Sequence, residues 1–321
     1  MSLEALALSR FDQLVASGDL LWQDVPPRYH PSTPFSFEFR VAASLISKPQ
    51  DKQQIPTAPV PSSTTATTAT KQRGAFDDEN SLFEILPNLG PHHRLILNKF
   101  SVVRPQFVIP TKNFEPQQNP LNAEDFAAIW QVLMDLPEEG SNNNKYMGIF
   151  NCGVNAGSSV GHKHLQVIPL PETIPEDENF LALLLKHIHE SEETLQPENK
   201  KNPATAAQTH FTLPKTPFKH AAHPLNPSKP TSPETLLEIW NHLCNITNIH
   251  PGTAHNLLLT REIMVAIPRP KAWMGSGAGE FAANAACMAG MVWCKTEEQY
   301  NAWMEFGPMK ALGEFGVGVD S

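Results

Sequence analysis

The segment Tyr146 to Pro171 reads YMGIFNCGVNAGSSVGHKHLQVIPLP. Its composition predicts one strand, a loop rich in glycine and serine, and a second strand. In the second strand, His162, His164 and Gln166 alternate with Lys163, Leu165 and Val167. Successive side chains of a strand point to opposite faces, so two imidazoles and an amide share one face while leucine and valine face the core. Such a polar row predicts a polar ligand.

The loop between these strands, Asn151 to Gly161, predicts a phosphate site. Its three glycines, Gly153, Gly157 and Gly161, allow backbone amides to turn towards one point, and Ser158 and Ser159 add hydroxyl donors. Successive amides of this kind form a concave site for anions. A neutral imidazole beside a bound phosphate indicates nucleophilic attack at phosphorus.

Gln166 favours transfer to an acceptor other than water. A hydrolase must deprotonate water, which a third titratable group would assist. Inorganic phosphate is already an anion and needs no base. A neutral amide in the third position can contact phosphoryl oxygens without activating water.

Helices are predicted at five places by apolar periodicity and start signals. The N-terminal helix is expected to stop near Gly18, and further helices are expected at 123–136, near residue 180, after Ser232 and after Thr296. Asn122 is a suitable N-cap, and Ser232 followed by Pro233 is the favoured order at a helix start. Alternating Phe35, Phe37 and Phe39 indicate a strand within 34–49, and a strand is considered within 210–222.

An internal repeat indicates two related halves. The segment His93 to Lys99 (HRLILNK) resembles His255 to Arg261 (HNLLLTR), and each copy continues into an apolar segment that ends in proline. Each copy therefore predicts two adjacent strands. A chance likeness between two hairpins is the alternative.

Two stretches of low complexity divide the chain. Residues 50–74 are rich in proline, serine, threonine and alanine, and residues 195–232 are similar at both ends. Such compositions cannot bury a core, so disorder is expected there. We predict an N-terminal half at 1–180, a partly disordered connecting segment at 181–232 and a C-terminal half at 233–321.

Composition excludes several classes of protein. The 321 residues carry a formal charge of −9, so we expect no broad basic face for nucleic acid. No apolar run is long enough for a membrane span. The N-terminus lacks the basic region of a signal peptide, and the four cysteines show no paired short spacing. We therefore expect a reducing compartment, the cytoplasm, with the nucleus left open.

The spacing Asn151-x-Gly153-x3-Gly157-x-Ser159-x2-His162-x-His164-x-Gln166 resembles the transferase branch of the histidine-triad superfamily. The wider chain is similar to the fungal-type diadenosine tetraphosphate phosphorylases (ATP adenylyltransferases). This likeness rests on LISKP at 45–49, LILNKF at 95–100, GSSVGHKHLQ, PFKH at 217–220 and HNLLLTREIMVAIPRPK. It implies an α+β fold like that of galactose-1-phosphate uridylyltransferase. Two related halves with antiparallel sheets and flanking helices then hold one active site, because only the first half carries the triad.

The resemblance also implies a mechanism and residue roles. His164 would attack the α-phosphorus of the dinucleotide, release ATP and pass AMP to inorganic phosphate, which gives ADP. Gln166 would contact the transferred phosphoryl group, and Lys48 would meet the polyphosphate and assist the departure of ATP. The remaining implied substrate-binding residues are Asn98, Asn151, Gly157, Ser158, Ser159, His162 and Asn284, with His162 equally open to a supporting role.

Other interpretations remain open at this point. A His-x-His pair fits a zinc site, but no third ligand at suitable spacing is evident. Gly157 to Gly161 fits the G-x-S-x-G motif of serine hydrolases, which requires a helix after the turn. A hydrolase of the same superfamily, a hexose-1-phosphate nucleotidyltransferase and a non-catalytic dinucleotide sensor are the remaining rivals.

The expected partners are small molecules: a dinucleotide polyphosphate, inorganic phosphate, ATP and ADP. Four phosphates need charge neutralisation that an acidic chain cannot supply broadly, so Mg²⁺ or another divalent cation is expected to accompany the polyphosphate. No metal ligands are assigned to the protein. Two halves in one chain make a monomer self-sufficient, and a dimer stays open.

Overall fold

The computed structural model describes residues 1–47, 76, 80–137, 145–194, 210–226 and 231–319. The predicted loop at 50–74 lies outside these residues, and so does Lys48. Within 195–232, the described residues are 210–226 and 231–232.

Among the described residues, eight strands form one antiparallel sheet in the order β3-β4-β5-β7-β6-β9-β10-β8. The strands are β3 (Glu84–Leu89), β4 (His93–Leu97), β5 (Phe107–Pro110), β6 (Tyr146–Cys152), β7 (His164–Pro169), β8 (Ala221–Pro224), β9 (His255–Leu259) and β10 (Ile263–Pro268). The repeat prediction is confirmed for the second copy, in which β9 pairs with β10. In the first copy β4 also pairs with the next strand, but the segment predicted as that strand, Val102 to Pro105, lies in the bend before β5. Because β6 pairs with β9, the two halves share this sheet.

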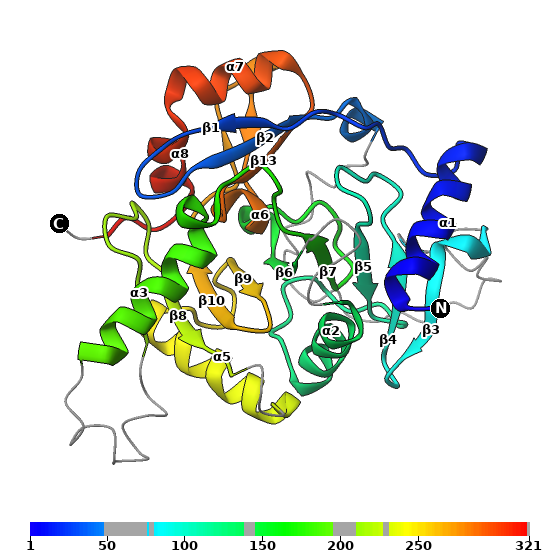
Figure 1. Cartoon of the computed structure of the whole chain (residues 1–321), viewed down its shortest axis with the longest axis horizontal. Helices are drawn as coiled ribbons and strands as arrows, with labels where there is room; N and C mark the ends of the chain where they lie inside the picture. The colour runs from blue at the N-terminus through cyan, green and yellow to red at the C-terminus, as the bar shows by residue number, and fades with distance from the viewer. Residues whose placement is uncertain (48–75, 77–79, 138–144, 195–209, 227–230, 320–321) are drawn as a thin grey trace, which may run out of the picture.

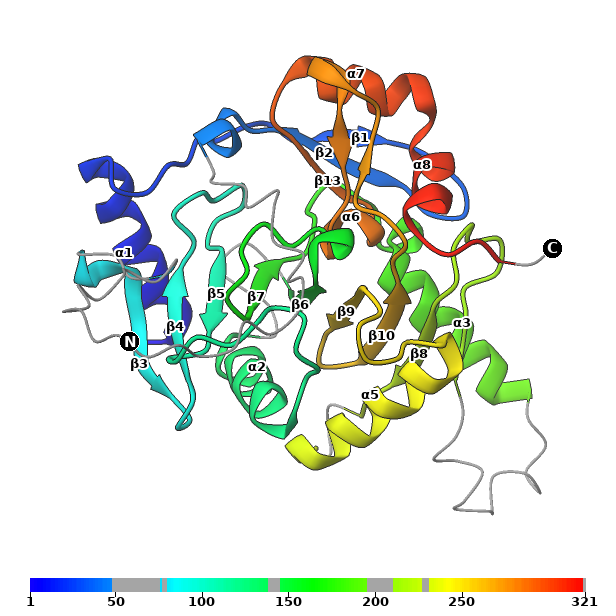
Figure 2. The same cartoon turned by 180° about the vertical axis from the view of Figure 1, so that it is seen from behind.

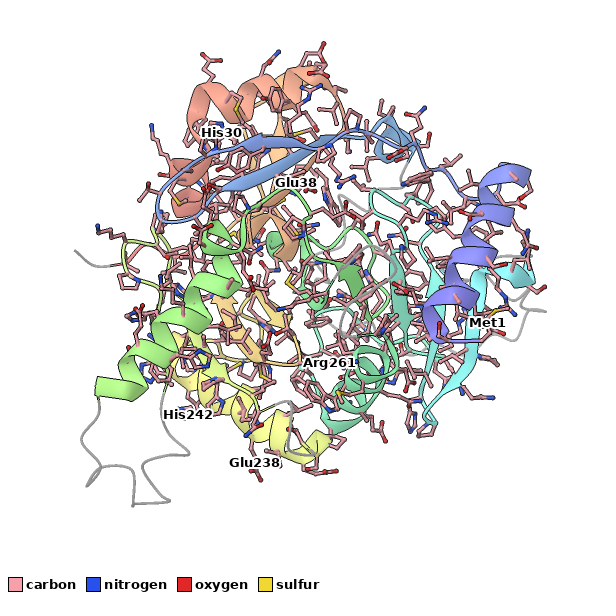
Figure 3. All side chains as sticks on the ribbon, in the orientation of Figure 1. Met1, His30, Glu38, Glu238, His242 and Arg261 are labelled. Carbon is pink, nitrogen blue, oxygen red and sulfur yellow. The ribbon has the colours of Figure 1, made fainter. Side chains whose placement is uncertain are left out.

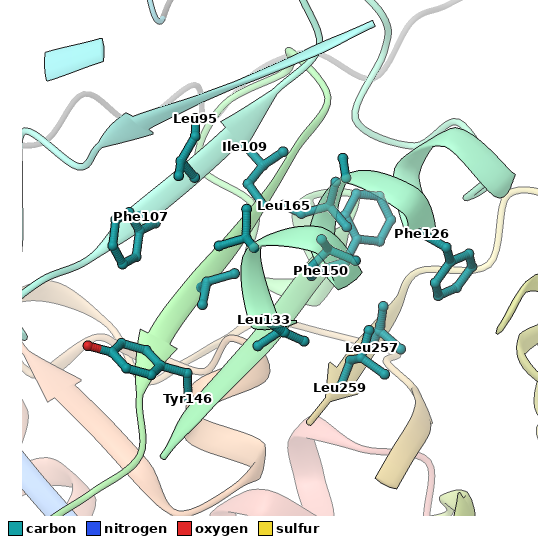
Figure 4. Close-up of a cluster of buried hydrophobic side chains, with 14 of the residues drawn as sticks. Leu95, Phe107, Ile109, Phe126, Leu133, Tyr146, Phe150, Leu165, Leu257 and Leu259 are labelled. Atoms are coloured by element: carbon teal, nitrogen blue, oxygen red, sulfur yellow. The ribbon is translucent and has the colours of Figure 1, made fainter. Parts of the chain in front are cut away.

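One face of the sheet is covered by three helices, α1 (Leu3–Ser17), α2 (Ala123–Asp135) and α5 (Pro233–Thr247). Their apolar stripes pack on the alternate residues of the strands, including Leu165 of β7 and Leu257 of β9 (Figure 4). The predicted caps are present: Asn122 accepts from the amides of Glu124 and Asp125, and Ser232 accepts from that of Thr235.

The other face is covered over its C-terminal part by a second layer (Figures 1 and 2). This layer holds β1 (Arg28–His30), β2 (Phe37–Val41), α3 (Phe180–Thr194), α6 (Ala285–Met288), β13 (Met291–Cys294), α7 (Glu297–Phe306) and α8 (Pro308–Phe315), beside the two-stranded sheet of β11 (Trp273–Met274) and β12 (Phe281–Ala282). β2 pairs with β13 in parallel, so the start of the chain lies against its end. Single-turn helices occur at Ala43–Ser47, Ser81–Phe83, Val154–Ala156, Glu176–Glu178 and Gly277–Gly279.

The connecting segment is integrated into the fold where it is described. α3 packs into the apolar cluster between the eight-stranded sheet and the second layer, and β8 forms the edge of that sheet next to β10. Of the strand considered within 210–222, only the last two residues, Ala221 and Ala222, lie in a strand, β8. Phe211 pairs with Ala222 through an isolated bridge. His220 is buried here; its Nε2 accepts from the amide of Leu213, and burial lowers its pKa to about 4.

A cation from the second half closes the C-terminal end of α2 in the first half. The Arg261 guanidinium donates to the carbonyls of Leu133, Met134 and Leu136, and Figure 3 shows Arg261 beside this helix. Unpaired carbonyls at a helix end carry partial negative charge, which a cation stabilises.

A buried ionic cluster fixes the start of α2 against β7. Lys163 Nζ lies 2.6 Å from Asp125 Oδ2 and donates to the carbonyl of Pro120, while His93 Nε2 lies 2.9 Å from Asp125 Oδ1. A carboxylate only accepts, so His93 donates through Nε2. Burial alone would raise the pKa of Asp125, but the bond from His93 and the charge of Lys163 outweigh it and hold that pKa below its usual value.

We expect Asp125→Ala to lower the free energy of unfolding by about 3–5 kcal/mol, because the Lys163 ammonium would stay buried without its main partner. Urea unfolding at pH 7 measures this, with the exposed neighbour Glu124→Ala as control. Because the folded pKa of Asp125 is lowered, its contribution is complete above about pH 4, the unfolded value, and is lost as pH falls further. A loss no larger than that of the control would contradict the assignment.

His255 should confer acid sensitivity. Its ring lies between those of Phe150 and Trp240, its Nδ1 donates to the carbonyl of Thr253, and its Nε2 has no partner among the described residues. Burial lowers its pKa to about 4. Since the unfolded value is about 6.5, the unfolded state binds the proton more tightly, and stability declines as pH falls from about 6.5 to 4.

We expect His255→Phe to reduce this decline by up to about 1.4 kcal/mol per pH unit, the value for one proton. Unfolding free energies measured by urea titration at several pH values test this. The exposed His250→Phe is the matched control. An unchanged slope for His255→Phe would show that the buried ring does not set the acid sensitivity.

Candidate active site

Strand β7 presents His164 and Gln166 on the face opposite the three-helix layer. Leu165 and Val167 belong to the core beneath α2, as the alternation predicts. Val108 of β5 pairs with Gln166, and Ile96 of β4 pairs with Val108, so both apolar side chains share the face of Gln166. Ile96 and Val108 are buried yet belong to neither core. They form an apolar floor beside the polar row.

The tautomer of His164 is fixed by a backbone carbonyl. His164 Nδ1 lies 2.8 Å from the carbonyl oxygen of His162. That oxygen can only accept, so Nδ1 carries the proton of the neutral ring and Nε2 carries the lone pair. The side chain is only 7% exposed. The geometry thus orients the ring and, in its neutral form, places the lone pair on Nε2.

Gln117 holds the two strands together at this histidine, and the sequence analysis missed it. Its Oε1 accepts from the His164 amide at 2.8 Å, and its Nε2 donates to the carbonyls of Asn151 at 2.9 Å and His164 at 3.2 Å. It lies in the loop between β5 and α2, where no periodicity or motif marks it. Its side chain replaces backbone pairing between the ends of β6 and β7.

His162 is held from the side of that same loop. Its Nε2 lies 3.0 Å from Thr111 Oγ1 and 3.2 Å from the Asn113 carbonyl, so Nε2 carries a proton. The rings of Phe76 and Phe114 each lie 5.4 Å from its own. These contacts favour a supporting role, in which His162 positions the carbonyl that orients His164.

The glycine loop is ordered by its own carbonyls. The amides of Ala156, Gly157 and Ser158 donate to carbonyls of Gly153 or Val154, and Ser158 Oγ donates to the Val160 carbonyl. Among the described residues, the amides of Ser159, Val160 and Gly161 have no acceptor. The amides of Val154 and Asn155, at the start of the short helix, also have no acceptor there, so backbone donors for a phosphate lie on both sides of the internally bonded residues.

Gly157 allows the C-terminal half to approach this loop. Its φ is +89°, and a Cβ at this position would lie 2.6 Å from the Ala283 carbonyl and 2.7 Å from Asn284 Cα. Asn284 caps α6 by accepting from the Cys287 amide at 3.1 Å. The structure thus brings Asn284 to the loop, with its side-chain oxygen already bonded as a helix cap.

Asn151 is the junction between the halves. Its Oδ1 accepts from Asn256 Nδ2 at 2.9 Å and from the Ala285 amide at 2.8 Å. Asn256 also donates to the Ala156 carbonyl at 2.9 Å. Strand β9 and helix α6 therefore fix both the end of β6 and the loop that follows it.

Behind Asn256 lies Arg269, which is 2% exposed. Its guanidinium donates to Asn256 Oδ1 and to the carbonyls of Phe315, Lys271 and Ala283. Burial lowers its pKa to about 10, so it stays charged at neutral pH. None of these four acceptors is a carboxylate. The sequence analysis did not single out Arg269 or Asn256.

The side-chain amides of three predicted site residues, Asn98, Asn151 and Gln166, are hydrogen-bonded in the same way. A backbone amide of Phe100 donates to Asn98 Oδ1 at 2.9 Å, and the oxygens of Asn151 and Gln166 likewise accept from protein donors. Each oxygen is therefore bonded within the protein, and each NH₂ group donates to no described residue. Such amides can donate to an anion but present no acceptor that would repel one.

One alternative interpretation does not fit this geometry. The Gly157 to Gly161 segment leads into β7 and not into a helix, so the nucleophile elbow of serine hydrolases is absent. Within the described residues, no three histidine, cysteine, aspartate or glutamate side chains are grouped to hold a metal.

None of the described helices is long and apolar enough to cross a membrane.

Two family models match the chain in succession. The Ap4A phosphorylase N-terminal domain matches residues 31–187, and the ATP adenylyltransferase C-terminal domain matches residues 214–318. Together they cover most of the chain, including the segment that carries His164 and the Asn256–Arg269 pair.

Two curated relatives come from Saccharomyces cerevisiae. The protein APA1 is 26% identical over 65% of this chain and 63% of its own length. Diadenosine 5′,5′′′-P1,P4-tetraphosphate phosphorylase 2 is 27% identical over 62% of this chain and 61% of its own length. The chain thus matches somewhat less than two thirds of each relative.

The fold is also found in a solved structure. The crystal structure of yeast Ap4A phosphorylase Apa2 is similar over the full length of both chains, with a TM-score of 0.74 and 20% identity. Apa2 in complex with Ap4A gives the same TM-score at 21% identity. The predicted α+β fold is confirmed. The chain belongs to the Ap4A phosphorylase (ATP adenylyltransferase) family.

Proposed function

We propose that this protein cleaves diadenosine tetraphosphate with inorganic phosphate to give ATP and ADP, through a histidine–AMP intermediate on His164. The observation that carries the proposal is the bond from His164 Nδ1 to the His162 carbonyl. It fixes the proton of the neutral ring on Nδ1 and the lone pair on Nε2, on a strand face that also carries the Gln166 amide, whose NH₂ group is a donor. Family membership and the Ap4A complex of Apa2 support this choice of substrate.

In the first step, Nε2 forms a bond to the α-phosphorus while the bond from that phosphorus to the ATP oxygen breaks. ATP leaves as an anion, and the imidazole becomes a cationic phosphoramidate. The bond from Nδ1–H to the His162 carbonyl then has a charged donor, which strengthens it as charge develops. Thr111 and Asn113 hold the His162 side chain and so keep this carbonyl in place.

In the second step, a phosphate oxygen attacks the same phosphorus and the N–P bond breaks, which releases ADP and neutral His164. The reverse sequence makes the dinucleotide and phosphate from ATP and ADP. The NH₂ groups of Gln166, Asn98 and Asn151 are suited to bind phosphoryl oxygens in both steps. Phosphate needs no deprotonation, so the absence of a carboxylate among these three favours phosphorolysis over hydrolysis.

Lys48 and Ser159 keep the roles that the resemblance implies. Lys48 is proposed to meet the polyphosphate and ease the departure of ATP. Ser159 is half-buried and follows the internally bonded part of the loop. Its amide and hydroxyl are proposed to bind the phosphate chain.

We expect ATP and ADP to form from diadenosine tetraphosphate and Mg²⁺ only when inorganic phosphate is present. Anion-exchange chromatography of the products measures this. His164→Ala should lower the steady-state rate at least about a thousandfold, because the covalent step is lost. His189→Ala, a histidine substitution on the exposed side of α3, should leave the rate unchanged.

Other product patterns would identify the rivals. Cleavage that proceeds equally well without phosphate would make water the acceptor and the protein a hydrolase. Binding without turnover, with unchanged affinity in His164→Ala, would indicate a sensor. Turnover only with a hexose 1-phosphate would indicate a sugar nucleotidyltransferase.

We further propose that a divalent cation enters with the polyphosphate as part of the substrate. The polar row at His164 consists of imidazoles and amides, whereas Mg²⁺ prefers carboxylate, phosphate and water oxygens. The phosphates themselves supply such oxygens. The cation would neutralise charge on the departing ATP.

Chelation with EDTA should therefore lower the rate at least about tenfold, and added Mg²⁺ should restore it. The melting temperature of the protein without nucleotide should not change on chelation, because no resident ion is removed. Differential scanning fluorimetry measures this second quantity. A large drop in melting temperature would instead indicate a metal bound by the protein.

A further inference from the structure

Gln106 lies directly behind Gln166 and is 2% exposed. It precedes β5, and its backbone carbonyl accepts from the Asn98 amide at 2.8 Å. Its side chain makes two bonds: Oε1 accepts from the Val102 amide at 3.0 Å, and Nε2 donates to Gln166 Oε1 at 3.1 Å.

These bonds determine which end of the Gln166 amide faces the substrate. A backbone N–H can only donate, so the atom of Gln106 that meets Val102 must be its oxygen. The other atom of the same amide is then the nitrogen, which only donates. Gln166 must therefore turn its oxygen towards Gln106, and its NH₂ group points away from Gln106.

We propose that Gln106 is a positioning residue that fixes the Gln166 amide with its NH₂ group towards the transferred phosphoryl group. This inference rests on the proposed function, which it deepens. Without Gln106, the Gln166 amide can rotate by half a turn and present an oxygen to an anion. A donor would then be replaced by a repulsive acceptor at the atom where charge develops.

The Val102 N–H thus fixes the orientation of the Gln106 amide, which in turn fixes that of Gln166. Both glutamines are more than nine-tenths buried, so water competes little for their bonds. The orientation is set before substrate arrives, which lowers the reorganisation needed in the transition state.

The test compares Gln106→Met, Gln106→Glu and Gln166→Ala with the wild-type chain. Methionine keeps the length of the side chain but cannot donate. Quench-flow measurement of ATP release in a single turnover reports the first chemical step. Gln106→Met should slow it about 10- to 100-fold, as Gln166→Ala should, with each protein still folded by circular dichroism.

Gln106→Glu supplies a pH signature that a purely structural role would lack. The ionised carboxylate accepts from Val102 but cannot donate to Gln166, whereas the protonated acid can do both. The rate of Gln106→Glu relative to wild type should therefore rise as pH falls from 8 to 5.5, and that of Gln106→Met should not. Gln13→Glu, the same substitution on the exposed side of α1, is the matched control and should follow wild type.

A double variant separates positioning from an independent effect. In Gln166→Ala the amide that Gln106 orients is gone, so adding Gln106→Met should change the rate by less than about twofold. A rate for the double variant equal to the product of the two single effects would overturn the inference. A rate for Gln106→Met within twofold of wild type would overturn it too.

Affinity for AMP, measured by calorimetry, tests the orientation without turnover. Gln106→Met should weaken AMP binding about tenfold, because a donor to the phosphate is lost. If wild type releases no ATP but this pattern holds, the proposed function fails and the orientation by Gln106 stands. If ATP is released normally and neither rate nor affinity responds to Gln106, only the positioning role fails.

Discussion

The antiparallel pairing of β6 with β9 is the constraint on which the site depends. It places Asn151 opposite Asn256 and so joins the two halves at the end of the strand that leads into the glycine loop. From this contact, Arg269 holds Asn256, and α6 approaches closely enough that residue 157 has to be glycine. His164, the proposed nucleophile, lies on the neighbouring strand, β7, so its position also depends on this junction.

The electrostatic character of the site comes from local groups and not from the whole chain. The chain carries a formal charge of −9, yet the residues assembled around His164 are neutral donors. Three amides have their oxygens bonded by the protein, and the buried charge of Arg269 is held only by neutral oxygens. An anion at this site therefore meets no fixed negative group among these residues, and the acidic surface remains compatible with an anionic substrate.

Local sequence predicted the elements well where local physics determines them. The caps Asn122, Ser232 and Thr296 start helices as expected, and Gly18 ends the first one. The alternation predicted His162, His164 and Gln166 on one face of a strand. This holds for His164 and Gln166, whereas His162 lies before the start of β7. Local sequence did not predict α6, a helix of four residues, or the parallel pairing of β2 with β13. Neither leaves a periodic pattern, and both form because segments distant in sequence cover the same apolar surface.

By itself, the sequence determined the family and led to the proposals for the strand that carries His164 and for its chemistry, because a strand of period two and a glycine-rich loop are recognised within a few residues. Only the tertiary structure decided how the reactive groups are oriented. Gln106, Gln117, Asn256 and Arg269 come from other strands and loops, and each acts through a hydrogen bond whose direction depends on which atoms fold together. A linear pattern specifies that an amide or an imidazole is present. Which of its atoms faces the substrate is set by donors and acceptors that meet only in the folded chain.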